Sequence, residues 1–188
     1  MTDANALCRL IAAGPWVRNN VASNLSPERP IHRELESYYK WSLRDGGVQC
    51  KEHIPVVVIV SPKYGDESIR KLVKRATQKF HELAHLYREK WRHPDSDGDD
   101  TKERYVHDLP TFYGFIIKFS VLSIVTYDSA KPDAPIRTLA TSNWARQGQE
   151  VWYAFAVAIA MVKARNYLIQ LDEEGELGPR IVESDPDL

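Results

Sequence analysis

One segment, residues 69–91, constrains the fold more than any other because it carries the clearest helical period in the 188-residue chain. Apolar residues recur along it at gaps of three and four, which is the spacing of one face of an α-helix. Asp66 and Glu67 precede the segment, and acidic side chains at that place cap a helix and complement its dipole. The pattern predicts a long amphipathic helix over about residues 66–92, which ends at His93 and Pro94.

Other segments are typical of β-strands. Residues 54–60 form a continuous run rich in β-branched side chains, which favours a strand buried on both faces. Residues 111–127 are too long for one ordinary strand, so they predict a hairpin with strands at about 111–118 and 120–127. Residues 136–144 predict a fourth strand. We expect the last three strands to form a meander and the aromatic side chains of the hairpin to lie in the core.

The remaining helices differ in character. Two short helices are predicted over residues 3–13 and 31–44, the first ended by Gly14 and Pro15. A long helix is predicted over residues 148–171, and it is apolar all round in its first three turns. Such a helix is expected to be sandwiched on several sides, and a homodimer interface is the alternative. Its bulky ridge consists of Trp152, Phe155, Ile159 and Val162.

These elements predict one α+β domain over residues 1–171. About four strands, mostly antiparallel, form a sheet that is packed by the helices over 66–92 and 148–171, with the two short N-terminal helices beside it. A length of 188 residues is enough for one hydrophobic core, and 43% hydrophobic with 27% charged residues is ordinary for a globular protein. Residues 172–188 are acidic, and we expect them to form a flexible C-terminal tail.

The cellular compartment is predicted from what the sequence lacks. Two cysteines, Cys8 and Cys50, make no disulfide framework, and the N-terminus has no signal-peptide pattern. The longest apolar run, residues 151–162, is 12 residues long, whereas a helix that spans a bilayer needs about 20. We therefore expect an intracellular protein, in the cytoplasm or nucleus, that does not span a membrane.

One motif suggests chemistry. His81-Glu82-Leu83-Ala84-His85 matches H-E-x-x-H, in which two histidines one helical turn apart bind Zn²⁺ and the glutamate acts as general base. This reading predicts a zinc-dependent hydrolase of the metallopeptidase kind, with His81 and His85 as ligands and Glu82 as the catalytic residue.

A catalytic zinc also needs a third protein ligand, and none stands at a diagnostic spacing. In the extended motif Arg88 occupies the glycine position and Trp91 the next ligand position. Arginine and lysine side chains also surround the two histidines, which disfavours a bound dication. The candidates for a third ligand are His93, Asp95, His107, Asp108 and Glu150.

The charge of the same helix favours another function. From Ile69 to Arg92 the sequence has eight Lys or Arg and two Glu, a net charge of +6 over about 36 Å of helix. On a helical projection a cationic ridge forms, made of Arg70, Lys74, His81, His85, Arg88 and Arg92. Such a ridge is able to hold an anionic partner, either an acidic protein segment or a nucleic-acid backbone, and a merely solvated outer face is the alternative.

The acidic tail supplies a possible internal competitor for that ridge. Residues 172–188 hold seven acids against one base, a net charge of −6, while residues 1–171 have 24 bases and 19 acids, a net charge of +5. We therefore predict a non-enzymatic binding domain without a cofactor, with the zinc hydrolase as the alternative. Motifs for nucleotide binding and for a serine nucleophile elbow are missing, and the acidic stretch from Asp95 does not fit an EF-hand.

Overall fold

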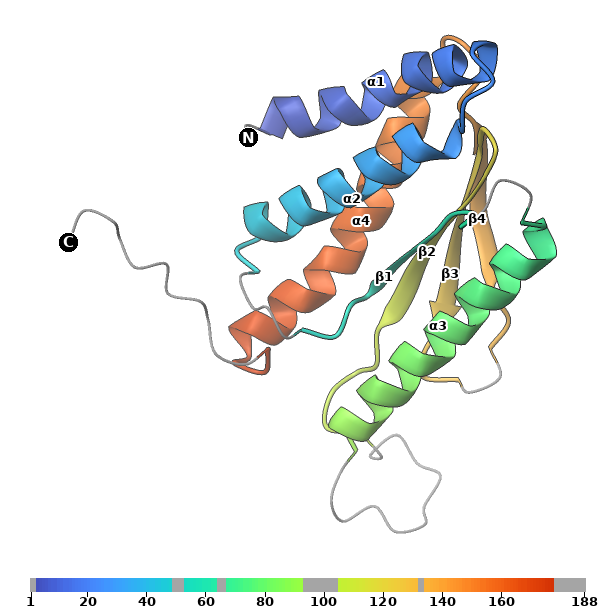
Figure 1. The fold of residues 1–188 in the computed structure, drawn as a ribbon. Coiled ribbons are helices and arrows are strands. Elements are labelled where there is room, and N and C mark those ends of the chain that lie inside the picture. Colours follow the sequence, from blue (N-terminus) through green and yellow to red (C-terminus); the bar gives the residue numbers. More distant parts are fainter. Residues whose placement is uncertain (1–2, 49–52, 64–66, 93–104, 132–133, 178–188) are drawn as a thin grey trace.

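A four-stranded mixed sheet lies between helices on both of its faces (Figure 1). The structure is a computed structural model that describes residues 3–48, 53–63, 67–92, 105–131 and 134–177. In chain order the elements are α1 (Asp3–Ala22), α2 (Glu28–Asp45), β1 (Val57–Val60), α3 (Ile69–Lys90), β2 (Thr111–Lys118), β3 (Val121–Asp128), β4 (Arg137–Asn143) and α4 (Glu150–Glu173). The predicted α+β fold with a mostly antiparallel sheet is confirmed.

The strands follow one another across the sheet in the order β1, β2, β3, β4. Strand β1 pairs in parallel with β2, whereas β2 with β3 and β3 with β4 pair antiparallel. Helix α3 connects the two parallel strands, so β1, α3 and β2 form a βαβ unit. The predicted hairpin and meander are confirmed, and the hairpin turns at Phe119 and Ser120 between the paired residues Lys118 and Val121.

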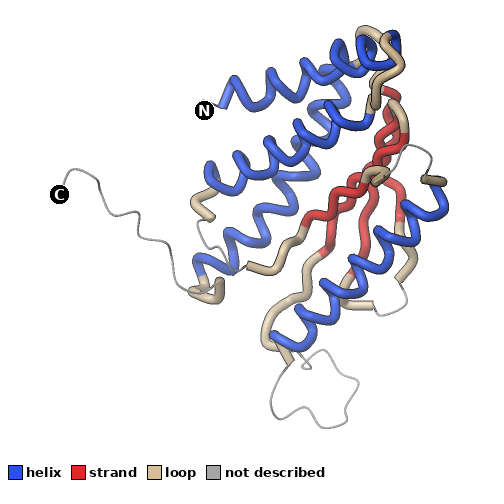
Figure 2. The backbone as a smooth tube through the Cα atoms, in the orientation of Figure 1, coloured by secondary structure: helices blue, strands red, loops and turns tan. Residues whose placement is uncertain are grey.

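The helices divide between the two faces of the sheet. Helix α3 packs on β1 and β2 from one side, while α2 and α4 pack from the other side (Figure 1, Figure 2). Helix α1 contacts α2 and α4 and so lies further from the strands. The N-terminal helices therefore belong to the layer that α4 forms, and among the described helices α3 covers the opposite face.

Aromatic rings fix α3 on the sheet. The ring of Phe80 stacks on Phe112 at 6.1 Å and on Tyr127 at 5.6 Å between centroids, and all three side chains are buried. Gly114 leaves the space for this contact, because a Cβ atom there would lie 2.5 Å from the ring of Phe80. The prediction that the hairpin aromatics lie in the core is confirmed for Phe112, Phe115 and Tyr127.

The N-terminal helices are longer than predicted. Helix α1 continues through Gly14 and Pro15 to Ala22, so the predicted end of the first helix is wrong. Leu10, Ala13 and Val17 are buried on both sides of the proline, and this packing outweighs the local cost of a proline inside a helix. Helix α2 begins at Glu28, before the predicted residue 31, since Pro30 falls in its first turn, where no N–H group needs a helical partner.

The last helix is packed by α1, α2 and β2, which agrees with the predicted sandwich, but part of its apolar surface stays exposed. Its buried side includes Ala154, Val157 and Met161, whereas Trp152 is 68% exposed and Ile159 is 60% exposed. Helix α4 is long and apolar enough to cross a membrane by length and composition alone, and 44% of its apolar window is buried in the protein. A core helix of a soluble protein has the same properties, so this feature is weak evidence of a membrane span.

Smaller differences concern the ends of elements. Strand β1 has four residues, and α3 begins at Ile69, where the side chain of Ser68 accepts a hydrogen bond from the amide of Lys71 at 3.4 Å. Ser68 therefore caps the helix in place of the predicted acids, and Glu67 has another role described below. Asp66, the acidic stretch from Asp95 and tail residues 178–188 lie outside the described residues.

Candidate functional site

Helix α3 presents two different flanks on either side of its buried stripe. The buried residues are Leu72, Ala76, Phe80, Ala84 and Tyr87. One flank, here called the ridge, carries the six predicted residues Arg70, Lys74, His81, His85, Arg88 and Arg92. The other flank lines a cleft beside β1 with Arg75, Gln78, Lys79 and Glu82.

The first four residues of the ridge are exposed to solvent. These residues are Arg70, Lys74, His81 and His85. The ring of His81 lies against that of Tyr127, with 5.5 Å between centroids. Nδ1 of His85 is 3.2 Å from a carboxylate oxygen of Glu89, one turn further along the helix. The structure thus brings these four side chains onto one accessible side of α3.

The two arginines at the end of the ridge are placed differently. Nε and Nη2 of Arg88 donate hydrogen bonds to the carbonyl oxygen of Ser129 at 2.9 and 2.8 Å. Arg88 therefore joins α3 to the loop after β3 and is only partly exposed. Arg92 is exposed and forms an isolated backbone bridge with Tyr105. The exposed part of the ridge therefore consists of its first four residues and Arg92, whereas Arg88 is partly buried.

The H-E-x-x-H motif has its histidines on the ridge and its glutamate towards the cleft. Glu82 is exposed and accepts a hydrogen bond from Nε2 of Gln78 at 2.9 Å. Within the described part of the chain, no group of three or more His, Cys, Asp or Glu side chains is arranged to hold a metal ion. A zinc ion on His81 and His85 would therefore need ligands from outside this part of the chain or from the substrate.

Of the described candidates for a third zinc ligand, His107 and Glu150 have other partners for their side chains. Nδ1 of His107 is 3.1 Å from Glu174, and its ring packs edge-on against Trp91. The backbone carbonyl of Asp108 accepts a hydrogen bond from Tyr167. His93 and Asp95 lie outside the described residues.

Glu150, the last of these candidates, joins two helices. It is buried in the first turn of α4 and forms an ion pair with Arg18 of α1. Burial raises the pKa of its carboxyl, but hydrogen bonds from its own backbone amide and from Arg18 outweigh burial and hold the pKa below its usual value. Glu150 is therefore a structural carboxylate at the α1–α4 contact.

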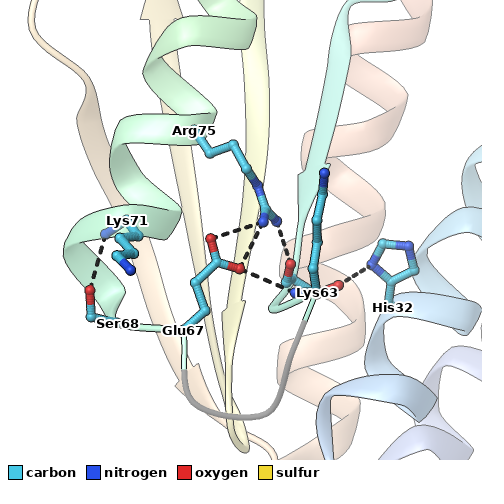
Figure 3. A network of polar contacts seen from close by, with 7 residues as sticks. His32, Lys63, Glu67, Ser68, Lys71 and Arg75 are labelled. Atoms are coloured by element: carbon cyan, nitrogen blue, oxygen red, sulfur yellow. Dashed lines mark hydrogen bonds and ion pairs between the residues drawn. The ribbon is translucent and has the colours of Figure 1, made fainter.

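The cleft lies beyond the last residue of β1, between α2 and α3. Two hollows of about 390 and 380 Å³ adjoin there and share His32, Ser61, Pro62 and Lys63 as lining residues. Helix α2 contributes His32, the loop after β1 contributes the next three residues, and α3 contributes the far wall. Figure 3 shows how side chains from these three places converge.

A partly buried ion pair braces the loop between β1 and α3. Nη1 of Arg75 lies 2.9 and 2.7 Å from the two carboxylate oxygens of Glu67, and Nη2 donates to the carbonyl oxygen of Ser61 (Figure 3). The same carboxylate accepts a hydrogen bond from the backbone amide of Lys63 at 3.1 Å. Both ends of the described loop are therefore tied to one guanidinium group.

A chain of polar contacts crosses from this loop to α2. The hydroxyl oxygen of Ser61 is 3.0 Å from Nδ1 of His32, and Nε2 of His32 is 3.2 Å from a carboxylate oxygen of Glu36. His32 and Glu36 are one helical turn apart, so α2 presents both on one side. The carboxylate beside Nε2 favours a proton on that nitrogen, and Nδ1 then accepts the hydrogen bond of Ser61.

Apart from Glu82, the cleft residues were not among the site residues predicted from sequence. The signals that point to them are Ser61, Pro62 and Lys63 directly after a buried strand, and the pair His32 and Glu36 one turn apart. Neither signal is specific by itself. The two become one site only because β1 ends beside α2, which local sequence patterns do not reveal.

Comparison with known proteins yields no matching family model, no similar curated protein and no similar solved structure. The function of this chain therefore has to be inferred from the two flanks of α3.

Proposed function

We propose that this protein is a binding domain whose α3 ridge contacts an anionic partner, either an acidic protein segment or a nucleic-acid backbone. The observation that carries this proposal is the common exposure of Arg70, Lys74, His81 and His85 on one side of α3. From Arg70 to His85 the helix rises about 22 Å, which matches a row of regularly spaced negative charges. Binding of this kind needs no catalytic group and no cofactor.

The charge balance of the ridge supports the proposal. In the described part of the chain, the one carboxylate that contacts these four side chains is Glu89, which lies beside His85. Arg70 and Lys74 have no acidic partner among the described residues, so an anion is able to bind them without breaking an ion pair in that part of the chain. Exposed cations of this kind attract phosphates or carboxylates by releasing counterions, and the affinity therefore falls as salt concentration rises.

The test is the salt dependence of binding to single-stranded nucleic acid and to an acidic peptide. The variant Arg70→Gln with Lys74→Gln should lower affinity about tenfold or more at low salt and should reduce the slope of log affinity against log salt by about 1.4 for single-stranded nucleic acid. Lys40→Gln with Arg44→Gln removes two exposed charges from α2 and serves as the matched control. Equal loss of binding in the ridge and control variants would contradict the proposal.

The zinc hydrolase is a second candidate, supported by the spacing and exposure of His81 and His85. One helical turn separates the two imidazoles, and both are accessible to an ion in solution. Under this proposal Glu82 would act as the general base. Metal analysis of the purified protein tests it, since stoichiometric zinc that disappears in His81→Ala would rank the hydrolase above the binding domain.

The acidic tail remains a proposed competitor for the ridge. The described part of the tail reaches the C-terminal end of α3, where Nζ of Lys90 donates to the carbonyl of Glu176 at 2.8 Å. Leu177 is buried, so the chain should be truncated after this residue to keep the fold. If the tail competes, removal of residues 178–188 will raise the affinity for nucleic acid at low salt.

A second copy of the chain is also a proposed partner, through α4. Exposed Trp152, Phe155 and Ile159 follow one another at helical spacing and form an apolar stripe that a second stripe of the same kind would cover. Sedimentation equilibrium tests this idea. A dimer that dissociates in Trp152→Ser with Ile159→Ser is expected, and a monomer at all concentrations would contradict it.

A further inference from the structure

The cleft beside β1 stands where ligands bind in many sheets with parallel strands. Ligands of such sheets lie beyond the carboxyl ends of the strands, because loops and helix starts converge there. In this protein β1 ends at Val60, and the cleft begins with Ser61, Pro62 and Lys63. The two adjoining hollows, of about 390 and 380 Å³, are large enough for a small molecule.

Exposed cations from three parts of the chain line this cleft. Arg29 comes from α2, Lys63 from the loop after β1 and Lys79 from α3. All three side chains are exposed, and none has an acidic partner in the part of the chain that the structure describes. Because these cations line adjoining hollows, they favour an anionic ligand there.

The carboxylates that line the cleft are already engaged. Glu28 is buried and accepts hydrogen bonds from the hydroxyl of Ser26 at 2.9 Å and the amide of Phe119 at 2.7 Å. Glu36 contacts His32, and Glu82 accepts from Gln78. These contacts hold the carboxylates in place, and the cationic side chains remain accessible to a ligand.

The floor of the cleft is held in place before any ligand arrives. The ion pair between Arg75 and Glu67 ties down the carbonyl of Ser61 and the amide of Lys63. The side chains of Arg75 and Glu67 are only 24% and 17% exposed, so solvent screens this ion pair less than a pair on the surface. A loop that is ordered in advance loses less entropy on binding, which raises affinity for a small ligand.

His32 and Ser61 together offer a donor that depends on protonation. With a neutral His32, the hydroxyl proton of Ser61 points to Nδ1 and is not available to an anion. If His32 takes up a proton, Nδ1–H donates to the oxygen of Ser61. The O–H group of Ser61 is then free to turn towards the cleft and to donate to a ligand. Nε2–H continues to donate to Glu36, so the protonated imidazole has a partner on each side.

We infer that this cleft binds the phosphate group of a small ligand and that binding is accompanied by proton uptake on His32. A phosphate accepts several hydrogen bonds at once, which suits the amino, guanidinium and hydroxyl donors that meet here. Charged groups around the imidazole are Glu28, Arg29, Arg33 and Glu36 on α2, Lys63 on the loop, and Arg75, Lys79 and Glu82 on α3. The inference goes beyond the proposed function, because the cleft and the ridge are different surfaces of α3.

Calorimetric titration with sulfate and with phosphate tests the inference. Sulfate keeps a charge of −2 between pH 6 and pH 8, so a change in its affinity over this range reports on the protein. Histidines take up protons in this range, and we expect sulfate to bind at least about fivefold more tightly at pH 6 than at pH 8. Titrations in buffers of different ionisation enthalpy should show uptake of up to one proton.

Variants assign the effect to the cleft. Lys63→Gln with Lys79→Gln should lower the affinity for sulfate at least about tenfold at both pH values. His32→Gln and Ser61→Ala should each remove most of the pH dependence while the thermal midpoint stays close to that of the parent protein. The ridge variant Arg70→Gln with Lys74→Gln should bind sulfate as the parent does, which separates this test from that of the proposed function.

Any of four results would overturn the inference. One is the absence of measurable sulfate and phosphate binding at about 10 mM ligand. A second is unchanged affinity in Lys63→Gln with Lys79→Gln, and a third is a pH dependence that persists in His32→Gln. Tighter binding of a phosphoserine peptide than of glycerol phosphate would overturn the assignment to a small ligand.

Discussion

The two flanks of α3 carry similar residues in very different surroundings. On the ridge, Arg70 and Lys74 extend into solvent from one helix. On the cleft flank, Arg75 is mostly buried and is bound to Glu67 and Ser61 from a neighbouring loop. Charges in solvent are screened by salt and by water, whereas charges in a partly buried cleft act more strongly over short distances.

This difference suggests different kinds of ligand for the two flanks. A ridge built from one helix recognises little beyond negative charge and its spacing, so it suits a long polyanion. A cleft built from α2, α3 and a braced loop surrounds its ligand and is able to select a particular group. The helix thus supplies cations to both sites, and its neighbours decide what each site is able to recognise.

The largest expected effect comes from the buried stripe that both flanks share. Phe80→Ala removes the ring that stacks on Phe112 and Tyr127, and the cavity should cost about 3–5 kcal/mol of the free energy of unfolding. Denaturant unfolding measures the change. Leu86→Ala on the same helix is the control, because Leu86 is 47% exposed and its loss should cost about 0.5 kcal/mol or less. Equal losses would mean that Phe80 does not hold α3 on the sheet.

A second substitution should act on the cleft and spare the ridge. Arg75→Gln breaks the contacts to Glu67 and to the carbonyl of Ser61, so the loop after β1 should lose its fixed position. We expect the affinity for sulfate to fall about tenfold, or about 1.4 kcal/mol, with little change in nucleic-acid binding.

The two affinities have to be measured on the same preparation of this variant, with its thermal midpoint as a check on folding. If nucleic-acid binding fell as far as sulfate binding, the two flanks would not be independent surfaces.

The smallest expected effect concerns Arg88, the ridge residue that is only partly exposed. Arg88→Gln removes two hydrogen bonds to the carbonyl of Ser129, which should cost about 1 kcal/mol of the free energy of unfolding. Affinity for nucleic acid should change much less than in the variant with Lys74→Gln. A large loss of affinity for nucleic acid with unchanged stability would mean that Arg88 belongs to the binding surface.

Local patterns in the sequence predicted the ridge but not the cleft. His81 and His85 were placed outside the apolar stripe by helical projection alone, and both are exposed in the structure. The contact of Arg88 with Ser129 joins residues 41 positions apart, and that of Ser61 with His32 joins residues 29 positions apart. Contacts over such separations depend on how the elements pack, which no window of local sequence contains.

The sequence by itself determined the elements that have strong local patterns. The buried stripe along α3 repeats at the helical period, and the β-branched and aromatic residues of β2 and β3 are typical of strands. These signals were sufficient for the α+β fold and for the hairpin turn at Phe119 and Ser120.

Only the tertiary structure decided where helices end and which of their sides are exposed in segments whose local signal is weak or contradictory. Helix α1 runs through Pro15 because Leu10, Ala13 and Val17 are buried against neighbouring helices. Helix α4 is apolar all round, so its sequence does not state which side is exposed, and packing leaves out Trp152 and Ile159. The cleft arises in the same way, because its charges come from segments that meet only when the sheet and helices have assembled.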